Sequence, residues 1–166
     1  MTSTTGTTQT TIEASKDVPT IAITREFDAP RELVFRAHTD PELYARWVGP
    51  RSVATRIDTW DVRRGGAWAF ANTRDGEQIA SFFGSFHDVW PNERIVWTFT
   101  FEGMPESVAL ETLTFEELPG GRTRLRILSL VESFQLRDSV LASGMDTGVE
   151  EGYEKLDDLL ASLTTT

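Results

Sequence analysis

Residues 144–163 read GMDTGVEEGYEKLDDLLASL, and their apolar side chains recur every three or four positions. That spacing places them along one stripe of an α-helix, with acidic side chains on the opposite face. The stripe consists of Met145, Val149, Tyr153, Leu156, Leu160 and Leu163. A helix this one-sided needs an apolar surface to lie on. We therefore expect it to pack across a sheet and to organise the rest of the chain.

The chain before this helix is dominated by strand patterns. Alternation is clearest at residues 94–102, where Ile95, Trp97 and Phe99 share one face. Strands are predicted at residues 20–27, 53–60, 67–73, 78–89, 94–102, 108–118 and 122–131. Two short helices are predicted after the first strand, at about residues 30–38 and 41–47. Short connections between the later strands are typical of an antiparallel meander, so the predicted fold class is α+β.

The composition and net charge of the chain limit the functions that the protein can have. The chain has 166 residues and a net charge of −10, from 16 basic and 26 acidic side chains. This charge argues against nucleic acid as a partner, because binding phosphates needs a basic patch. There is no cysteine, which excludes disulfides and zinc-thiolate sites. No apolar run reaches the roughly 20 residues of a membrane span, so membrane insertion is not expected.

The expected organisation is one domain. Residues 1–18 are predicted to be a disordered, threonine-rich tail without the features of a signal peptide. Residues 19–163 form the predicted domain, and residues 164–166 are predicted to fray. A cytoplasmic location is expected, with the protein a monomer or a homodimer.

Short motifs along the predicted domain resemble one known family. They are Phe27-Asp-Ala-Pro30, Thr39-Asp-Pro41, Asp61-Val-Arg-Arg-Gly-Gly-Ala-Trp68, Gly84-Ser-Phe86, Pro91-Asn-Glu-Arg94, Gly120-Gly-Arg-Thr123 and Ser143-Gly-Met145. Their order resembles the AHSA family, the homologues of the activator of the heat-shock-protein-ninety ATPase, within the START-like (Bet v 1-like, SRPBCC) superfamily. The resemblance implies a helix-grip fold, in which a curved antiparallel sheet of about six to seven strands wraps a long C-terminal helix.

The resemblance also implies a cavity between sheet and helix that holds a lipid, a polyketide or another apolar molecule. The candidate ligand-binding residues are Trp47, Trp68, Phe70, Phe83, Phe86, Trp97, Phe99, Met145, Val149, Tyr153 and Leu156. The polar candidates to orient a ligand are Asn72 and His87, with Thr112, Ser129 and Tyr153 also considered. A shift of one residue in strand register would turn a polar candidate to the other face of the sheet.

Three functions remain open. The preferred one is binding of a small hydrophobic molecule without catalysis, because no catalytic constellation is recognisable. The second is a polyketide cyclase or aromatase, and the third is a stress-response protein that binds a chaperone through its outer surface. His38 and His87 are the only histidines and have no short ligand spacing to one another, so neither a metal site nor a cofactor is expected.

Overall fold

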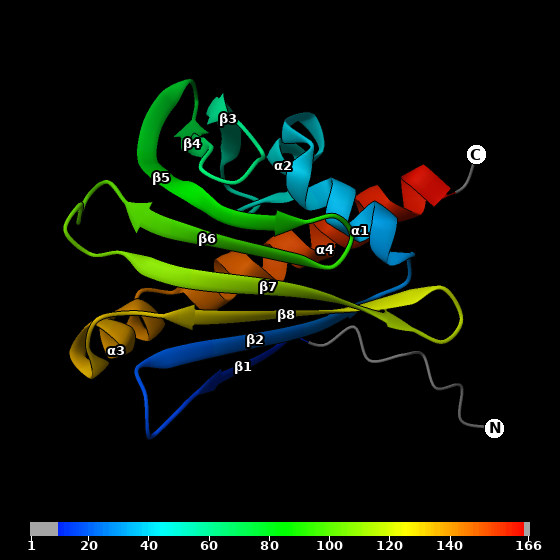
Figure 1. The fold of residues 1–166 in the computed structure, drawn as a ribbon. Coiled ribbons are helices and arrows are strands. Elements are labelled where there is room, and N and C mark those ends of the chain that lie inside the picture. Colours follow the sequence, from blue (N-terminus) through cyan, green and yellow to red (C-terminus); the bar gives the residue numbers. More distant parts are fainter. Residues whose placement is uncertain (1–9, 165–166) are drawn as a thin grey trace.

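The computed structural model of the protein describes residues 10–164. Its strands are β1 (Thr11–Ala14), β2 (Thr20–Phe27), β3 (Ala54–Trp60), β4 (Ala67–Arg74), β5 (Glu77–Trp90), β6 (Arg94–Phe101), β7 (Ala109–Leu118) and β8 (Arg122–Leu130). Its helices are α1 (Arg31–Thr39), α2 (Pro41–Trp47), α3 (Phe134–Ala142) and α4 (Met145–Thr164). The described strands form one antiparallel sheet in the order β1-β2-β8-β7-β6-β5-β4-β3 (Figure 1).

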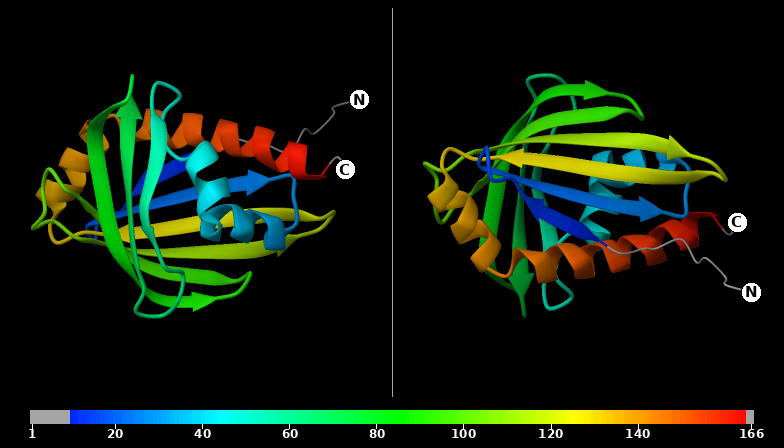
Figure 2. Two further views of the ribbon diagram at one scale, coloured as in Figure 1. Left: turned by 90° about the horizontal axis from the view of Figure 1, so that it is seen from above. Right: turned by 90° about the horizontal axis from the view of Figure 1, so that it is seen from below.

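The sheet curves around α4, which runs along its concave side (Figure 2). The apolar stripe of α4 is buried there, with Tyr153, Leu156 and Leu160 among its most enclosed side chains. The Tyr153 ring meets Phe27 of β2 edge to face, with ring centres 5.5 Å apart. The predicted α+β class and helix-grip arrangement are therefore confirmed, including the two short helices before the meander.

The two ends of the described chain differ from the prediction. Thr11–Ala14, which the sequence predicts to be part of the disordered tail, form β1, because they pair with β2 and Ile12 packs against the core. The sheet consequently has eight strands, one more than the predicted range. The rest of the predicted tail, residues 1–9, lies outside the described residues, as do residues 165 and 166. Thr164, predicted to fray, is the last residue of α4.

Helix α3 has no counterpart among the predicted elements. Its start is capped by the Ser133 side chain, which accepts a hydrogen bond from the Leu136 amide at 3.1 Å. Its Arg137 side chain is buried and donates to the carbonyls of Ser15 and Thr20, at 2.8 and 3.0 Å. Since these bonds join distant parts of the chain, apolar periodicity alone could not reveal the helix.

Two glycines allow backbone segments to approach closely. A β-carbon at Gly84 on β5 would lie 1.9 Å from the Thr98 carbonyl oxygen of β6, which only glycine avoids. The register of β5 with β6 shifts between Phe86 and Asp88, which marks a β-bulge. Gly152 places α4 against the end of α2, where a β-carbon would lie 3.3 Å from the Trp47 carbonyl oxygen. No helix within residues 10–164 combines the length and apolar character needed to cross a bilayer.

Candidate functional site

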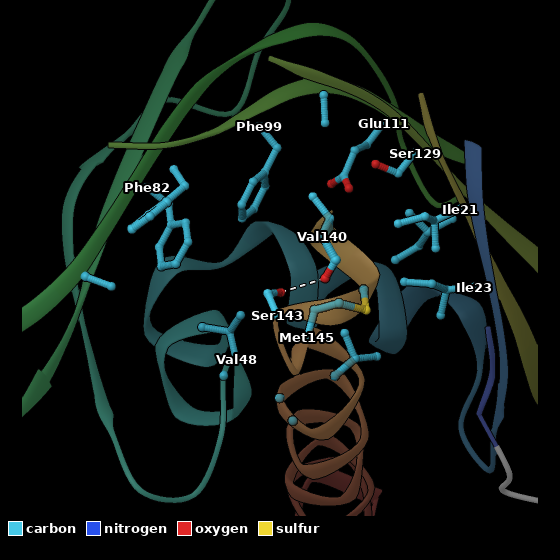
Figure 3. A pocket seen from close by; sticks show the side chains of 18 of the residues that line it. Ile21, Ile23, Val48, Phe82, Phe99, Glu111, Ser129, Val140, Ser143 and Met145 are labelled. Atoms are coloured by element: carbon cyan, nitrogen blue, oxygen red, sulfur yellow. Dashed lines mark hydrogen bonds between the residues drawn. The ribbon is translucent and has the colours of Figure 1, made fainter. Parts of the chain in front are cut away.

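A cavity of about 660 Å³ lies between the concave face of the sheet and α4. The sheet supplies side chains from both halves, such as Ile21 and Ile23 from β2 and Phe82 from β5 (Figure 3). Val140 of α3, Met145 of α4 and Ser143 in the connection between them also line it. The connection after α2 and the loop between β6 and β7 complete the wall. The lining is mostly apolar, as is typical of small-molecule sites.

The wall contains many of the predicted site residues. They are Trp47, Phe70, Asn72, Trp97, Phe99, Ser129, Met145, Val149 and Tyr153. They come from α2, β4, β6, β8 and α4, which the curvature of the sheet brings around one space. Contact of these side chains with a ligand stays a prediction.

The remaining predicted residues lie outside this cavity. They are Trp68, Phe83, Phe86, His87, Thr112 and Leu156. Trp68 is fully buried behind the wall, with its ring 5.1 Å from Trp97 and 5.0 Å from Phe99. Phe83 and His87 are exposed, because neighbouring residues of a strand point to opposite faces and Phe82 and Phe86 take the inner one. Some of the predicted rings are therefore part of the packed core, and others face solvent.

One carboxyl group lies in this mostly apolar wall. Glu111 of β7 lies in one cross-strand row with Trp97 of β6 and Ser129 of β8. Its carboxyl group points into the cavity beside Ser129 (Figure 3). The Trp97 indole N–H donates a hydrogen bond to Glu111 Oε1 at 2.9 Å. Burial raises the pKa of Glu111, while hydrogen bonding from Trp97 and Ser129 opposes that rise by stabilising the carboxylate.

A buried imidazole lines the cavity as well. His38 of α1 is 1% exposed, and its Nδ1 lies 2.8 Å from the Val34 carbonyl oxygen. A carbonyl oxygen can only accept, so Nδ1 carries the proton and Nε2 is left as an acceptor. Nε2 is buried and has no hydrogen-bond partner within residues 10–164. Burial lowers the pKa of His38 to about 4, and the bond to Val34 opposes this only partly.

Two tyrosines complete the titratable groups in the described lining. Tyr44 from α2 and Tyr153 from α4 are both buried and both line the cavity. Burial raises the pKa of each phenol above its ordinary value, and the nearby Glu111 raises it further. At neutral pH both phenols, like His38, are uncharged. Four titratable side chains from four different elements thus meet in one cavity.

Glu111, His38 and Tyr44 were not among the predicted site residues. The signal for Glu111 is present in the sequence, because alternation places it on the same face as Leu113 and Phe115. A lone carboxylate on the apolar face of a strand is unusual enough to mark a site. His38 gives a similar signal beside Val34 and Phe35 of α1, which are buried with it. Tyr44 gives none, since an aromatic residue on a buried helix face is ordinary.

An antiparallel sheet gripping a C-terminal helix over an internal cavity defines the helix-grip class of protein. The chain belongs to the family of Activator of Hsp90 ATPase homolog 1-like proteins, whose model matches residues 28–161. A search of curated proteins finds no match.

Solved structures from bacteria share the fold. One from Rhodobacter sphaeroides is 27% identical, with a TM-score of 0.82 over 92% of this chain and 99% of that one. One from Mycobacterium smegmatis is 26% identical, with a TM-score of 0.81 over 95% and 99%. A solution structure from Arthrobacter aurescens is 26% identical, with a TM-score of 0.82 over 92% and 91%. The similarity extends over nearly the whole of each chain, so the match concerns the complete domain.

Proposed function

We propose that the protein binds a small hydrophobic molecule, such as a lipid, a polyketide or an aromatic metabolite, in the cavity between its sheet and α4. The observation that carries this proposal is the cavity itself, about 660 Å³ with a mainly apolar lining. Protein interiors are close-packed, with few voids larger than a water molecule. Ligand sites, in contrast, have volumes of about 300–1,000 Å³. Membership of a family with a ligand-binding fold supports the same function.

A glycine in the cavity wall provides the test. Gly148 of α4 lines the cavity, and a β-carbon there would meet only the Pro50 ring, at an ordinary 3.6 Å. Gly148→Leu therefore adds a side chain at the wall without a backbone clash, and leucine favours the helix by about 1 kcal/mol over glycine. We expect the variant to stay folded and to lose binding of the neutral fluorescent probe N-phenylnaphthylamine.

The matched control is Ala161→Leu, which adds apolar bulk to an exposed position of the same helix. It should bind the probe as the wild type does. Saturable probe binding in the wild type that survives Gly148→Leu unchanged contradicts a cavity site. A wild type that binds neither this probe nor any member of a panel of fatty acids, flavonoids and polyketides contradicts the proposed function as a whole.

One observation favours a second candidate, a cyclase-type enzyme. Glu111, Tyr44, Tyr153 and His38 surround one apolar space, and perturbed titratable groups gather at catalytic sites. Such groups could assist enolisation of a bound polyketone by general acid–base catalysis. The check is cyclisation of a model polyketone: catalysis must exceed buffer and must fall in Glu111→Gln. Rates equal to buffer in the wild type dismiss this candidate and leave the binding function intact.

The family description names a chaperone ATPase, which makes chaperone binding a third candidate. Docking on the outer surface would not depend on the cavity. Gly148→Leu should then retain a chaperone partner in a pull-down while losing the small-molecule probe. The same variant thereby separates surface binding from cavity binding.

A further inference from the structure

The cavity has one acidic group and no basic partner for it among the described lining residues. Glu111 is the only acidic side chain in its described lining, and no lysine or arginine accompanies it there. The hydrogen-bond donors beside the carboxyl group, the Trp97 indole and the Ser129 hydroxyl, are both neutral. Both stabilise a carboxylate but neither balances its charge. Two buried arginines have other partners. Arg25 is bound to Asp157 on α4, at 2.6 Å, and Arg137 donates to the carbonyls of Ser15 and Thr20.

The other titratable groups around the cavity do not supply a cation. Tyr44 and Tyr153, from α2 and α4, are neutral phenols whose pKa values Glu111 raises further. His38 of α1 is neutral at physiological pH, since burial lowers its pKa to about 4. Any positive charge that pairs with Glu111 inside the cavity must therefore come with the ligand.

We infer that the cavity selects apolar molecules carrying a basic amine, which binds Glu111 as an ammonium group, and rejects those carrying a carboxylate. This inference rests on the proposed binding function. An ammonium beside Glu111 gives a pair with no net charge, whichever partner holds the shared proton. A carboxylate ligand would leave net negative charge in an apolar space, where attraction and repulsion are both stronger than in water. A neutral alcohol gains only a hydrogen bond.

The surroundings of the cavity act in the same direction. The loop between β6 and β7 contributes Met104 and Val108 to the wall and also carries Glu102 and Glu106. The whole chain has a net charge of −10. An incoming cation is therefore attracted and an incoming carboxylate repelled, both of which affect the rate of association.

The test compares three probes with the same ten-carbon chain: decylamine, decyl alcohol and decanoate. Each probe is tested for displacement of N-phenylnaphthylamine from the wild type near neutral pH. Every probe is kept below its own critical micelle concentration. We expect decylamine to bind at least tenfold more tightly than decyl alcohol, and decanoate to bind more weakly than the alcohol. This ranking is measured in the wild type, so it does not depend on a variant folding correctly.

Glu111→Gln then assigns the preference to one side chain. Glutamine has nearly the same volume and keeps an oxygen that can accept the Trp97 N–H, but it has no charge. We expect the preference for amine over alcohol to fall to less than threefold. The matched control is Glu117→Gln, which removes one charge from an exposed position of the same strand. It should keep the wild-type preference.

The outcomes are distinct. If the alcohol binds but the amine binds no more tightly, or decanoate binds best, the inference is wrong and the binding function stands. If the amine preference is unchanged in Glu111→Gln, the charge responsible is not that of Glu111 and the inference is again wrong. If none of the three probes nor the fluorescent probe binds the wild type, the inference is wrong, and the panel of fatty acids, flavonoids and polyketides then decides whether the proposed function is wrong as well.

Discussion

The Arg25 guanidinium on β2 and the Asp157 carboxylate on α4 form two parallel hydrogen bonds, of 2.8 and 2.6 Å, across 132 positions of the chain. Arg25 is 2% exposed and also lies over the Phe27 ring, 4.9 Å from its centre. A charge this deep is stable only with a partner. The pair therefore fixes how α4 lies over the sheet, and with it the position of Tyr153 one turn earlier in the helix.

Removing one partner of this pair should be costly. Asp157→Asn leaves the Arg25 charge buried without its counterion, and we expect a loss of about 3–5 kcal/mol in the free energy of unfolding. Glu154→Gln is the matched control. Glu154 lies on the same helix as Asp157, and the change removes its charge from an exposed pair with Arg51. It should change the free energy by less than about 1 kcal/mol. Equal losses from the two changes in urea unfolding would show that burial does not matter at Arg25.

Glu111→Gln should stabilise the folded protein above the ordinary pKa of glutamate. Burial raises the pKa of Glu111 in the folded state. The unfolded chain therefore ionises this group more readily, and stability falls as pH rises from the unfolded pKa through the folded one. The variant lacks this loss, so its melting temperature should exceed that of the wild type at mildly alkaline pH. The two should converge at acidic pH, where the carboxyl group is protonated in both states. A destabilised variant at every pH would mean that Glu111 is a structural acceptor.

His38 should destabilise the protein in mild acid. Its folded pKa of about 4 lies below the ordinary histidine value of 6.5, so the unfolded state takes up a proton first. The contribution is fully present above the unfolded pKa and is lost as pH falls toward the folded one. Between about pH 7 and about pH 5 the loss amounts to about 2 kcal/mol. Urea unfolding of His38→Gln should lack this slope, whereas His87→Gln, at an exposed position, should retain it.

Tyr153 should matter to folding through its ring and to the cavity through its hydroxyl. Tyr153→Phe keeps the edge contact with Phe27 and the packing on Trp47, whose ring centre lies 6.0 Å away. We expect it to change the free energy of unfolding by less than about 1 kcal/mol and to alter only the choice of ligand. Tyr153→Ala should cost about 3–5 kcal/mol. A large loss in the phenylalanine variant would reveal a structural hydrogen bond from the hydroxyl.

The two glycines on the inner face of α4 should respond differently to alanine. Gly148→Ala meets only the Pro50 ring at 3.6 Å and should gain about 1 kcal/mol from helix propensity. Gly152→Ala presses against the Trp47 carbonyl oxygen at 3.3 Å and the Gly49 amide at 3.4 Å. Since both contacts are with backbone atoms, the gain should be absent or reversed. Thermal unfolding of the two variants checks this, and equal gains would contradict the close approach of α2 and α4.

The sequence predicted most of the helices and strands and the class of fold, but neither β1 nor α3. The stripe from Met145 to Leu163 and the alternation at Ile95, Trp97 and Phe99 depend only on the periods of helix and strand, which neighbouring residues express directly. The family motifs added the order in which these elements pack, and the structure confirms it. The short strand β1 was not predicted, because its stability comes from pairing with β2 and not from a pattern within the strand itself.

Periodicity along the chain does not reveal which side chains share the cavity. Trp68 and Trp97 both alternate with their strand neighbours in the same way. Trp97 nevertheless lines the cavity, whereas Trp68 lies behind the wall and packs its ring against that of Trp97. The register of β6, β7 and β8 placed Glu111 between Trp97 and Ser129. That register is a property of the pairing between neighbouring strands. A pattern within one strand cannot specify it, because side chains from distant strands meet only after the sheet has closed around α4.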